Sequence, residues 1–463
     1  MSSTQAEPQL TRLRDWDLWS KYVLFFMVGF SLTGRSFSYL GIPPLKLFIG
    51  DITLAAFIFL RPRQLFDRWF GALTTGGPLA PFSWVLLISI LYGVFETIRG
   101  ILSGFSPLIA LQNLVFNLYP LFFFLGIWIG ARRPDLMPTF IKIYAWGLCI
   151  YGPLYFLFLH KITLTMPGSD SVAVFGQAGG GAFVILGLLC FVPKPGRYWL
   201  PITVGALIFL AGQVRSDWFG AALAFSIWGI LERKLKAVAM FFAGLVVLLL
   251  LGAVFDVNLP SPSTRGGAIS SREIVARGLS AIDPEMAKDY TGSAETGMYA
   301  GTISWRETWW HAIWANSQEN MTNLIIGPGY GFLLKNLVSY LKSMDLRTPH
   351  NIFYFALGYT GWAGVVIFFA LQIACATLLW RTYRVTGQAF GLAAWASTLF
   401  AAFFGNVLET PSGAIPLYLT IGVLVAPSLS TYLEPLRHRR GYPENQPQEL
   451  AGLNAVDEAY AGK

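Results

Sequence analysis

Residues 237–267, AVAMFFAGLVVLLLLGAVFDVNLPSPSTRGG, pass abruptly from an uninterrupted apolar run into a polar stretch that continues to about Pro349. The apolar run is long enough for a helix that crosses a bilayer, which needs about 20 such residues. The polar stretch separates two groups of similar apolar segments, about a dozen in all, on either side of it. This pattern predicts a membrane protein with many spans and one large extramembrane loop, in which we expect its function to lie.

The composition supports this class. Hydrophobic residues make up 54% of the 463-residue chain and charged residues only 13%, which excludes an ordinary soluble domain. Only helices and closed barrels satisfy their backbone groups in lipid, and continuous rather than alternating apolar runs predict helices. A net charge of +8 is also typical of proteins that bind nucleic acid. The basic residues lie largely in short connections between apolar segments, however, so we expect membrane lipids as partners and no nucleic acid.

The fold predicted is all-α, with about twelve spanning helices. They are expected near residues 19–35, 44–60, 80–98, 107–130, 137–159, 173–192, 199–214, 217–231, 237–255, 349–380, 388–408 and 414–432.

The orientation follows from Lys and Arg in the short connections, because cytoplasmic loops carry more of them. Alternate connections are basic, as in Arg132-Arg133, and the intervening ones hold scattered single charges such as Arg99. Both termini fall in the basic set, so the lead 1–18 and a disordered tail 433–463 are expected in the cytoplasm. The loop 256–348, between spanning segments 19–255 and 349–432, is then expected on the outer face.

Within the outer loop, residues 304–320 have the period of an amphipathic helix. The segment 327–331, Gly-Pro-Gly-Tyr-Gly with Tyr330 in it, is expected to end that helix, and a second helix is expected near 332–344. Two rows of residues follow the helical spacing. The first, largely apolar, is Trp305, Trp309, Ile313 and Asn316, and the second is Arg306, Trp310 and Trp314. The tryptophans suit a helix that lies at the membrane interface.

Thr348-Pro349-His350-Asn351 opens the first apolar segment after the loop. Pro349 is expected at the first helical position with Thr348 as the cap, which places His350 in the first turn. The positive helix end disfavours imidazolium, so His350 is a candidate general base. The alternative is an interfacial histidine that serves only its own helix.

Two arginines share the outer face with His350. Arg215 is expected to end the segment 199–214, two residues before Asp217, and Arg306 follows Trp305 in the loop. The simpler interpretation of Arg215 is an interfacial arginine paired with Asp217. The simpler interpretation of Arg306 is a charge on a solvated helix face. Guanidinium groups bind phosphate oxygens in bidentate fashion, so the arginines and a neutral histidine together suit a diphosphate leaving group and a hydroxyl nucleophile. Paired carboxylates at metal-binding spacing are not evident on the outer face, which favours a reaction without metal or other cofactor.

Four local patterns in one order resemble the O-antigen ligase and polymerase superfamily of bacterial inner-membrane glycosyltransferases. The resemblance covers roughly residues 200–380, and the His-Asn segment is its most specific part. The patterns are Arg215-Ser216, the stretch Trp305-Arg306-Glu307-Thr308-Trp309, the glycine-rich 326–331, and 350–364, HNIFYFALGYTGWAG.

The resemblance implies a helical glycosyltransferase of the C type in the bacterial inner membrane. His350 would be the base on the acceptor hydroxyl, and Arg215 and Arg306 would hold the diphosphate of an undecaprenyl-linked glycan. Asn351, Asp217, Trp305 and Tyr330 are possible supporting residues. Transfer would invert the anomeric centre and need no metal or other cofactor. Asp217 departs from the small residues usual there and weakens the assignment of Arg215.

Three alternatives stay open. A ligase transfers a finished glycan to lipid A–core, whereas a polymerase for O-antigen or exopolysaccharide uses the same chemistry on another glycan; the loop and the His-Asn segment favour the ligase. A polysaccharide or lipid-linked oligosaccharide transporter would also suit twelve spans, although related halves are not evident. An inert scaffold would leave the arginines and the histidine unexplained.

Overall fold

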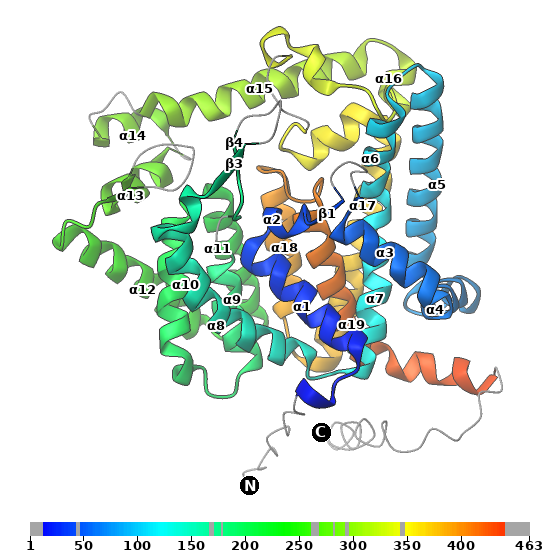
Figure 1. Cartoon of the computed structure of the whole chain (residues 1–463), viewed down its shortest axis with the longest axis horizontal. Helices are drawn as coiled ribbons and strands as arrows, with labels where there is room; N and C mark the ends of the chain where they lie inside the picture. Colours follow the sequence, from blue (N-terminus) through cyan, green and yellow to red (C-terminus); the bar gives the residue numbers. More distant parts are fainter. Residues whose placement is uncertain are drawn as a thin grey trace.

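The computed structural model describes residues 13–42, 47–165, 171–176, 179–260, 268–280, 283–291, 296–342 and 348–439. The first twelve residues of the expected lead, and the tail from residue 440, lie outside this part of the chain. The described residues are almost wholly helical (Figure 1), as the apolar runs predict. Three antiparallel hairpins are additions: β1 (Gly41–Ile42) with β2 (Leu47–Phe48), β3 (Thr163–Thr165) with β4 (Ser171–Ala173), and β5 (Leu259–Pro260) with β6 (Ala268–Ile269).

Each expected apolar segment coincides with a helix, because each is a local run that satisfies its own backbone. The helices in these segments are α1 (Leu18–Thr33), α3 (Ile49–Leu60), α5 (Ala80–Leu102), α6 (Pro107–Leu118) with α7 (Phe122–Arg132), α8 (Leu136–Leu157), α9 (Gly181–Phe191), α10 (Trp199–Ala211), α11 (Arg215–Leu231), α12 (Leu235–Val254), α17 (Ile352–Thr386), α18 (Phe390–Ala402) and α19 (Pro411–Arg439). Outside them lie α2 (Arg35–Ser38), α4 (Pro62–Thr75), α13 (Ser271–Leu279), α14 (Pro284–Thr291), α15 (Thr296–Gln318) and α16 (Met321–Ile326).

Six of the described helices are long and apolar enough to cross a membrane: 80–102, 107–132, 136–157, 235–254, 352–386 and 411–429. The helices α1, α3, α9 and α18 are apolar but shorter. The chain is therefore a helical multi-pass membrane protein, whereas the total of about twelve spans and their orientation stay predictions.

The centre of the bundle is the pair α7 and α19. Nearly every residue of α7 is buried, including Phe122, Phe123 and Phe124. Side chains added at Gly126 or Gly130 would meet the backbone of Leu419 to Val423. Glycine at these positions lets the two backbones approach closely, which is a common means of helix association in membranes.

Several boundaries differ from those expected. The helix predicted from residue 44 begins at Ile49, because residues 47–48 form strand β2, which pairs with β1 at residues 41–42. The helix predicted from 173 begins only at Gly181, after β4, and that predicted to 408 ends at Ala402. The tail expected to be disordered from 433 is helical through Arg439, as the last part of α19.

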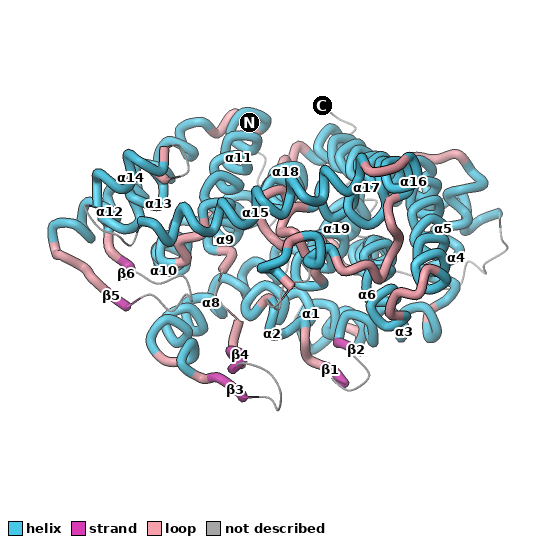
Figure 2. Tube along the Cα trace, turned by 90° about the horizontal axis from the view of Figure 1, so that it is seen from above, coloured by secondary structure: helices cyan, strands magenta, loops and turns pink. Residues whose placement is uncertain are grey.

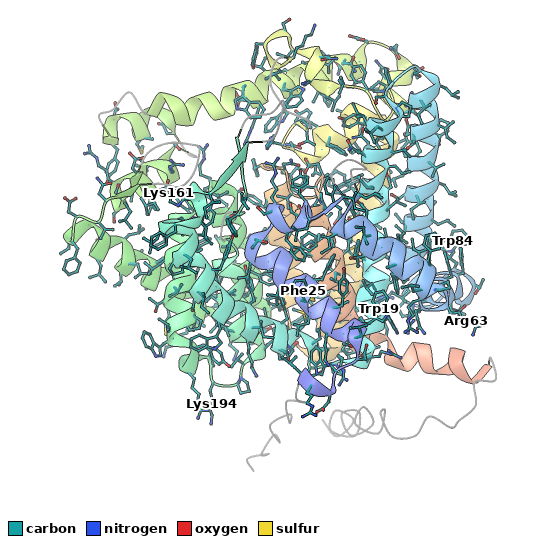
Figure 3. All side chains as sticks on the ribbon, in the orientation of Figure 1. Trp19, Phe25, Arg63, Trp84, Lys161 and Lys194 are labelled. Carbon is teal, nitrogen blue, oxygen red and sulfur yellow. The ribbon has the colours of Figure 1, made fainter. Side chains whose placement is uncertain are left out.

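The outer loop lies across one end of the bundle. Its longest helix, α15, runs along the top of the molecule between α14 and α16, and α17 begins beneath it (Figure 1). Seen from above, α15 passes over the region of α18 and α17 (Figure 2). Lys194 and Arg63, from connections predicted to be cytoplasmic, lie at the opposite end (Figure 3). The expected second loop helix at 332–344 is wrong over the residues described there, 332–342, which form only the 3-10 turns Leu334–Leu337 and Ser339–Leu341.

Candidate functional site

The amphipathic helix predicted at 304–320 exists but starts earlier, at Thr296, so Arg306 lies near its middle. The predicted apolar row is its inward face, since Trp309 and Ile313 are fully buried and Asn316 nearly so. Trp309 does not lie at the lipid surface: its indole Nε1 donates to the carbonyl of Leu334 at 2.9 Å. The helix is thus anchored to the loop beneath it.

His350 lies just before α17 and not within its first turn. The helix begins at Ile352, and Asn351 caps it by accepting hydrogen bonds from the amides of Phe353 (2.9 Å) and Tyr354 (3.3 Å). The expectation that Thr348 is the cap, with Pro349 as the first helical residue, is therefore wrong. Asn351 takes the role because its short amide reaches the amides two and three residues ahead.

The backbone of His350 has φ of +56°, the left-handed region that residues other than glycine rarely adopt. Such a conformation costs about 1 to 3 kcal/mol and persists only where the surroundings impose it. Here the carbonyl of the preceding Pro349 accepts a 2.8 Å hydrogen bond from Nε1 of Trp310, and the Trp310 ring stacks on Tyr354 at 5.3 Å. The α15 helix therefore holds the turn that presents the imidazole.

Trp305 joins the two strongest candidates. Its indole meets the His350 imidazole edge to face, with ring centroids 5.6 Å apart. The guanidinium carbon of Arg306 lies 5.3 Å from the centroid of the Trp305 ring, within the range of a cation–π contact. Nη1 of Arg306 also donates to the carbonyl of Phe404 at 3.0 Å. An imidazole and a guanidinium, far apart in sequence, thus share one tryptophan at the end of the bundle that α15 covers.

Arg215 opens α11, whereas the sequence placed it at the end of the preceding helix. Its Nη1 donates to Oγ of Ser280 at 3.1 Å and to the Ser280 carbonyl at 3.4 Å, which ties it to the end of α13. Asp217 lies in the first turn of the same helix. Gln213, two residues before Arg215, is buried, and its backbone is left-handed like that of His350, with φ of +50°. That Arg215 joins Arg306 and His350 at one substrate stays a prediction.

Tyr330 has a packing position. It is 1% exposed, its hydroxyl donates to Oδ1 of Asn117 at 2.6 Å, and its amide donates to the carbonyl of Glu96 at 3.3 Å. These contacts fix the glycine-rich segment against α5 and α6, so we do not include Tyr330 among the substrate-binding candidates.

The helix that follows His350 is broken. Gly361 has φ of +59°, and the freed carbonyls are satisfied from other elements: Thr360 accepts from the hydroxyl of Tyr92 at 2.7 Å, and Tyr359 from the amide of Gly329 at 3.0 Å. A Cβ at Gly361 would lie 2.6 Å from the Gly327 nitrogen. The first part of α17 is therefore a short half-helix fixed at both ends.

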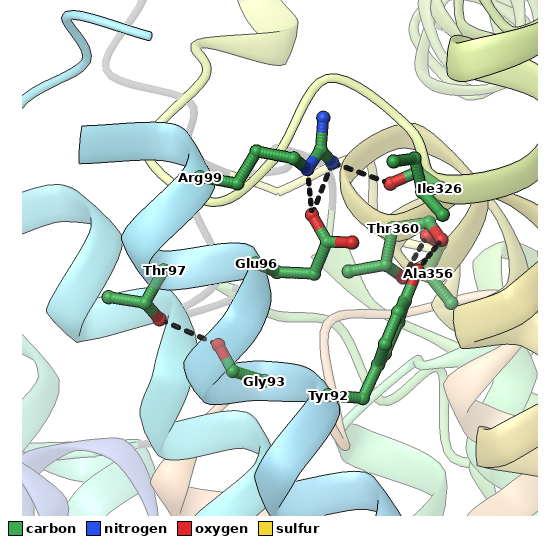
Figure 4. A network of polar contacts seen from close by, with 8 residues as sticks. All are labelled: Tyr92, Gly93, Glu96, Thr97, Arg99, Ile326, Ala356 and Thr360. Atoms are coloured by element: carbon green, nitrogen blue, oxygen red, sulfur yellow. Dashed lines mark hydrogen bonds and ion pairs between the residues drawn. The ribbon is translucent and has the colours of Figure 1, made fainter. Parts of the chain in front are cut away.

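Figure 4 shows how α5 holds this break. Arg99 forms an ion pair with Glu96 and donates from Nη2 to the carbonyl of Ile326 at 2.7 Å. Glu96 is fully buried, and a buried carboxylate requires such a partner. From the sequence, Arg99 was expected only to be a single charge in a connection between spans, but in the structure it positions the segment before the break.

The connection 403–410 holds residues that the sequence reading missed. Two polar atoms in it, Oδ1 of Asn406 and Oε1 of Glu409, are buried without a hydrogen-bond partner among the described residues. Desolvation raises the pKa of Glu409 to about 8, although the amide of Val407 donates to its Oε2 at 3.0 Å. The Phe404 carbonyl in this connection accepts from Arg306. The sequence places an amide and an acid close together in a short connection, Gly-Asn-Val-Leu-Glu-Thr, which could have indicated these polar residues. They were overlooked because a spanning helix was expected to continue to residue 408.

The fold and this site together define a helical multi-pass membrane protein with an imidazole–indole–guanidinium cluster between α15 and the start of α17. No protein-family model matches the chain, and a search of curated proteins gives no match. Within the described ranges, groups of three or more His, Cys, Asp or Glu side chains placed to hold a metal ion are not found. The expectation of a metal-independent reaction stays a prediction.

Proposed function

We propose that the protein is a glycosyltransferase of the O-antigen ligase type, which transfers a glycan from undecaprenyl diphosphate to a hydroxyl of lipid A–core or a related acceptor. The observation that carries the proposal is the contact of Trp305 with both His350 and Arg306. A base and a phosphate-binding cation on one ring suit a displacement in which a proton and a diphosphate leave together.

In the proposed reaction the acceptor oxygen attacks the anomeric carbon from the face opposite the diphosphate. A new C–O bond forms, the bond from the anomeric carbon to the diphosphate oxygen breaks, and its electron pair leaves with undecaprenyl diphosphate. The imidazole of His350 accepts the hydroxyl proton. Arg306, with Arg215, binds the charge that develops on the departing diphosphate. A single displacement of this kind inverts the anomeric centre.

The left-handed backbone of His350 decides the best test variant. An alanine would remove the imidazole but also strain the turn, whereas asparagine tolerates this conformation. We therefore expect His350→Asn to lower glycan transfer from an undecaprenyl-diphosphate donor by at least about a hundredfold, the usual contribution of a general base, while protein level and insertion hold. The matched control is His311→Asn, an exposed histidine on α15, which should transfer normally.

The products identify the acceptor in cells that lack the native gene. Unligated polymer accumulates if the protein is a ligase, whereas single repeat units accumulate if it is a polymerase with the same chemistry. Transfer that survives His350→Asn at a near-normal rate would rule out the proposed base. A parallel pair tests the cation: Arg306→Gln should weaken transfer, and Arg272→Gln, an exposed arginine on α13, should not.

One observation favours the transporter alternative, since carriers often bind substrate where a spanning helix is broken. The break at Gly361 is nevertheless filled by the backbone of Ile325 to Gly327 and sealed by hydrogen bonds from Tyr92 and Gly329. An unwound segment that binds cargo must face a cavity instead. The filled break is better suited to holding His350 than to transport.

A further inference from the structure

A cavity of about 150 Å³ lies at the end of the bundle opposite His350. It lies between the end of α7, the start of α8, the ends of α9 and α17, the start of α18 and the middle of α19. A single water needs only about 10–15 Å³ measured in this way, so the space admits a larger group. Lys194, at the same end of the molecule (Figure 3), follows α9.

The wall of this cavity contains both polar and apolar groups. Arg133, Thr382, Thr386 and Gln388 supply its polar groups, and apolar side chains that include Met137, Phe191, Leu379 and Leu424 supply the rest. A wall of both kinds suits a ligand with a charged head and a hydrocarbon body. A phospholipid has both parts. Because the surrounding helices are those of a membrane protein, phospholipids are also present in excess.

Arg133 is placed to receive the charged head. One of its terminal nitrogens, Nη2, donates to the carbonyl of Asp15 at 3.0 Å, and the guanidinium lies 5.4 Å from the centroid of the Trp16 ring. These two contacts fix a planar group whose fork matches phosphate oxygens. Arg381 and Arg384 lie in the last turns of α17, whose end lines the cavity, and add a field that attracts anions.

We propose that this cavity binds the phosphate headgroup of an anionic phospholipid, with Arg133 as its ligand and the apolar wall in contact with the lipid chains. The site is separate from the His350 cluster and independent of the proposed glycosyl transfer. Its occupant would fill the junction of six helices, among them the central pair α7 and α19, and so stabilise the bundle by mass action.

The neighbouring arginine provides a matched control. Arg132 is exposed, lies over the Trp128 ring and does not line the cavity, whereas Arg133 does. The carboxylate of Asp17 interacts with both arginines, so the two differ in position more than in electrostatic surroundings. Gln388 is exposed at the mouth, and Gln388→Trp would block the space while leaving Arg133 intact.

The experiment measures thermal unfolding of the full chain in detergent micelles during titration with phosphatidylglycerol, phosphatidylcholine or inorganic phosphate. Phosphatidylglycerol should raise the unfolding midpoint of the natural protein and of Arg132→Gln with the same half-maximal concentration. In Arg133→Gln that concentration should rise by about tenfold, as expected for loss of one charge-assisted contact, and Gln388→Trp should show a similar loss.

Three results would overturn the assignment. An equal effect of Arg132→Gln and Arg133→Gln would indicate diffuse attraction of the basic surface and not a site. Equal stabilisation by phosphatidylcholine would show that an anionic headgroup is not required. Equal stabilisation by inorganic phosphate would show that the ligand is a free anion and not a lipid. Because unfolding is the readout, none of these results depends on glycosyl transfer.

Discussion

The indole of Trp305 meets the imidazole of His350 edge to face at 5.6 Å, and 45 positions of sequence separate the two residues. The same indole lies under the guanidinium of Arg306. An edge-to-face pair and a cation–π contact are each worth about 0.5 to 1.5 kcal/mol. Trp305 thus positions both candidate groups without requiring any chemistry of its own.

Replacing this ring should impair transfer more than folding. Trp305→Leu removes both ring contacts and should lower the rate of glycan transfer about tenfold, the effect of roughly 1.4 kcal/mol on a barrier. Trp305→Phe keeps a ring and should retain most of the rate. Trp314→Leu, a more exposed tryptophan on the same helix, is the control. A rate unchanged in Trp305→Leu would show that the contact is incidental.

The break in α17 should tolerate only glycine. Gly361 has φ of +59° and its Cβ would lie 2.6 Å from backbone atoms of Ile325 and Gly327. Gly387 has φ of +73° but open space around it. Gly387→Ala should therefore cost about 1 to 2 kcal/mol of conformational strain, and Gly361→Ala clearly more, because the segment must also move. The midpoints of thermal unfolding of the two variants measure the difference; equal midpoints would contradict the close approach.

The cap of α17 can be tested at two neighbouring residues. Asn351→Ala removes the acceptor for the amides of Phe353 and Tyr354 and should cost about 1 kcal/mol of stability. Asn351→Asp should restore it. Thr348→Val should have little effect, since the capping hydrogen bonds come from Asn351. Hydrogen exchange at the amides of Phe353 and Tyr354 should accelerate in Asn351→Ala only, and faster exchange in Thr348→Val would restore threonine as the cap.

Glu409 should make stability depend on pH. Its pKa is raised from 4.5 to about 8 by desolvation, so between these values the folded state holds a proton that the unfolded state releases. Stability should fall as pH rises from about 4.5 to about 8 and then level off. Glu409→Gln cannot ionise and should gain on the natural protein as pH rises through this window. Unfolding midpoints at pH 5, 6.5 and 8 would show it.

The comparison for Glu409 is Glu319→Gln, an exposed glutamate at the end of α15. Its removal should leave the dependence of the unfolding midpoint on pH as in the natural protein. If Glu409→Gln and the natural protein instead kept a constant difference from pH 5 to pH 8, Glu409 would be ionised in the folded state and its carboxyl well solvated.

The sequence by itself determined the helices and the class of protein. Runs such as 237–255 satisfy their own backbone and bury their side chains in lipid, so their structure depends on local composition. The helical spacing of Trp309, Ile313 and Asn316 on one face of α15 was predicted for the same reason, whereas the burial of Trp309 was not. Arg306 and His350 were predicted as site residues from their residue type and their expected place at the outer face.

Only the tertiary structure decided which of these residues meet and in what conformation. The left-handed turn at His350, the cap at Asn351 and the break at Gly361 depend on partners from α5, α15 and the glycine-rich segment, which no local pattern specifies. Glu409 acquired its raised pKa by desolvation in the folded chain. Contacts between distant segments cost chain entropy when the intervening loop closes. Only the packing of the complete fold offsets this cost, so no local pattern predicts them.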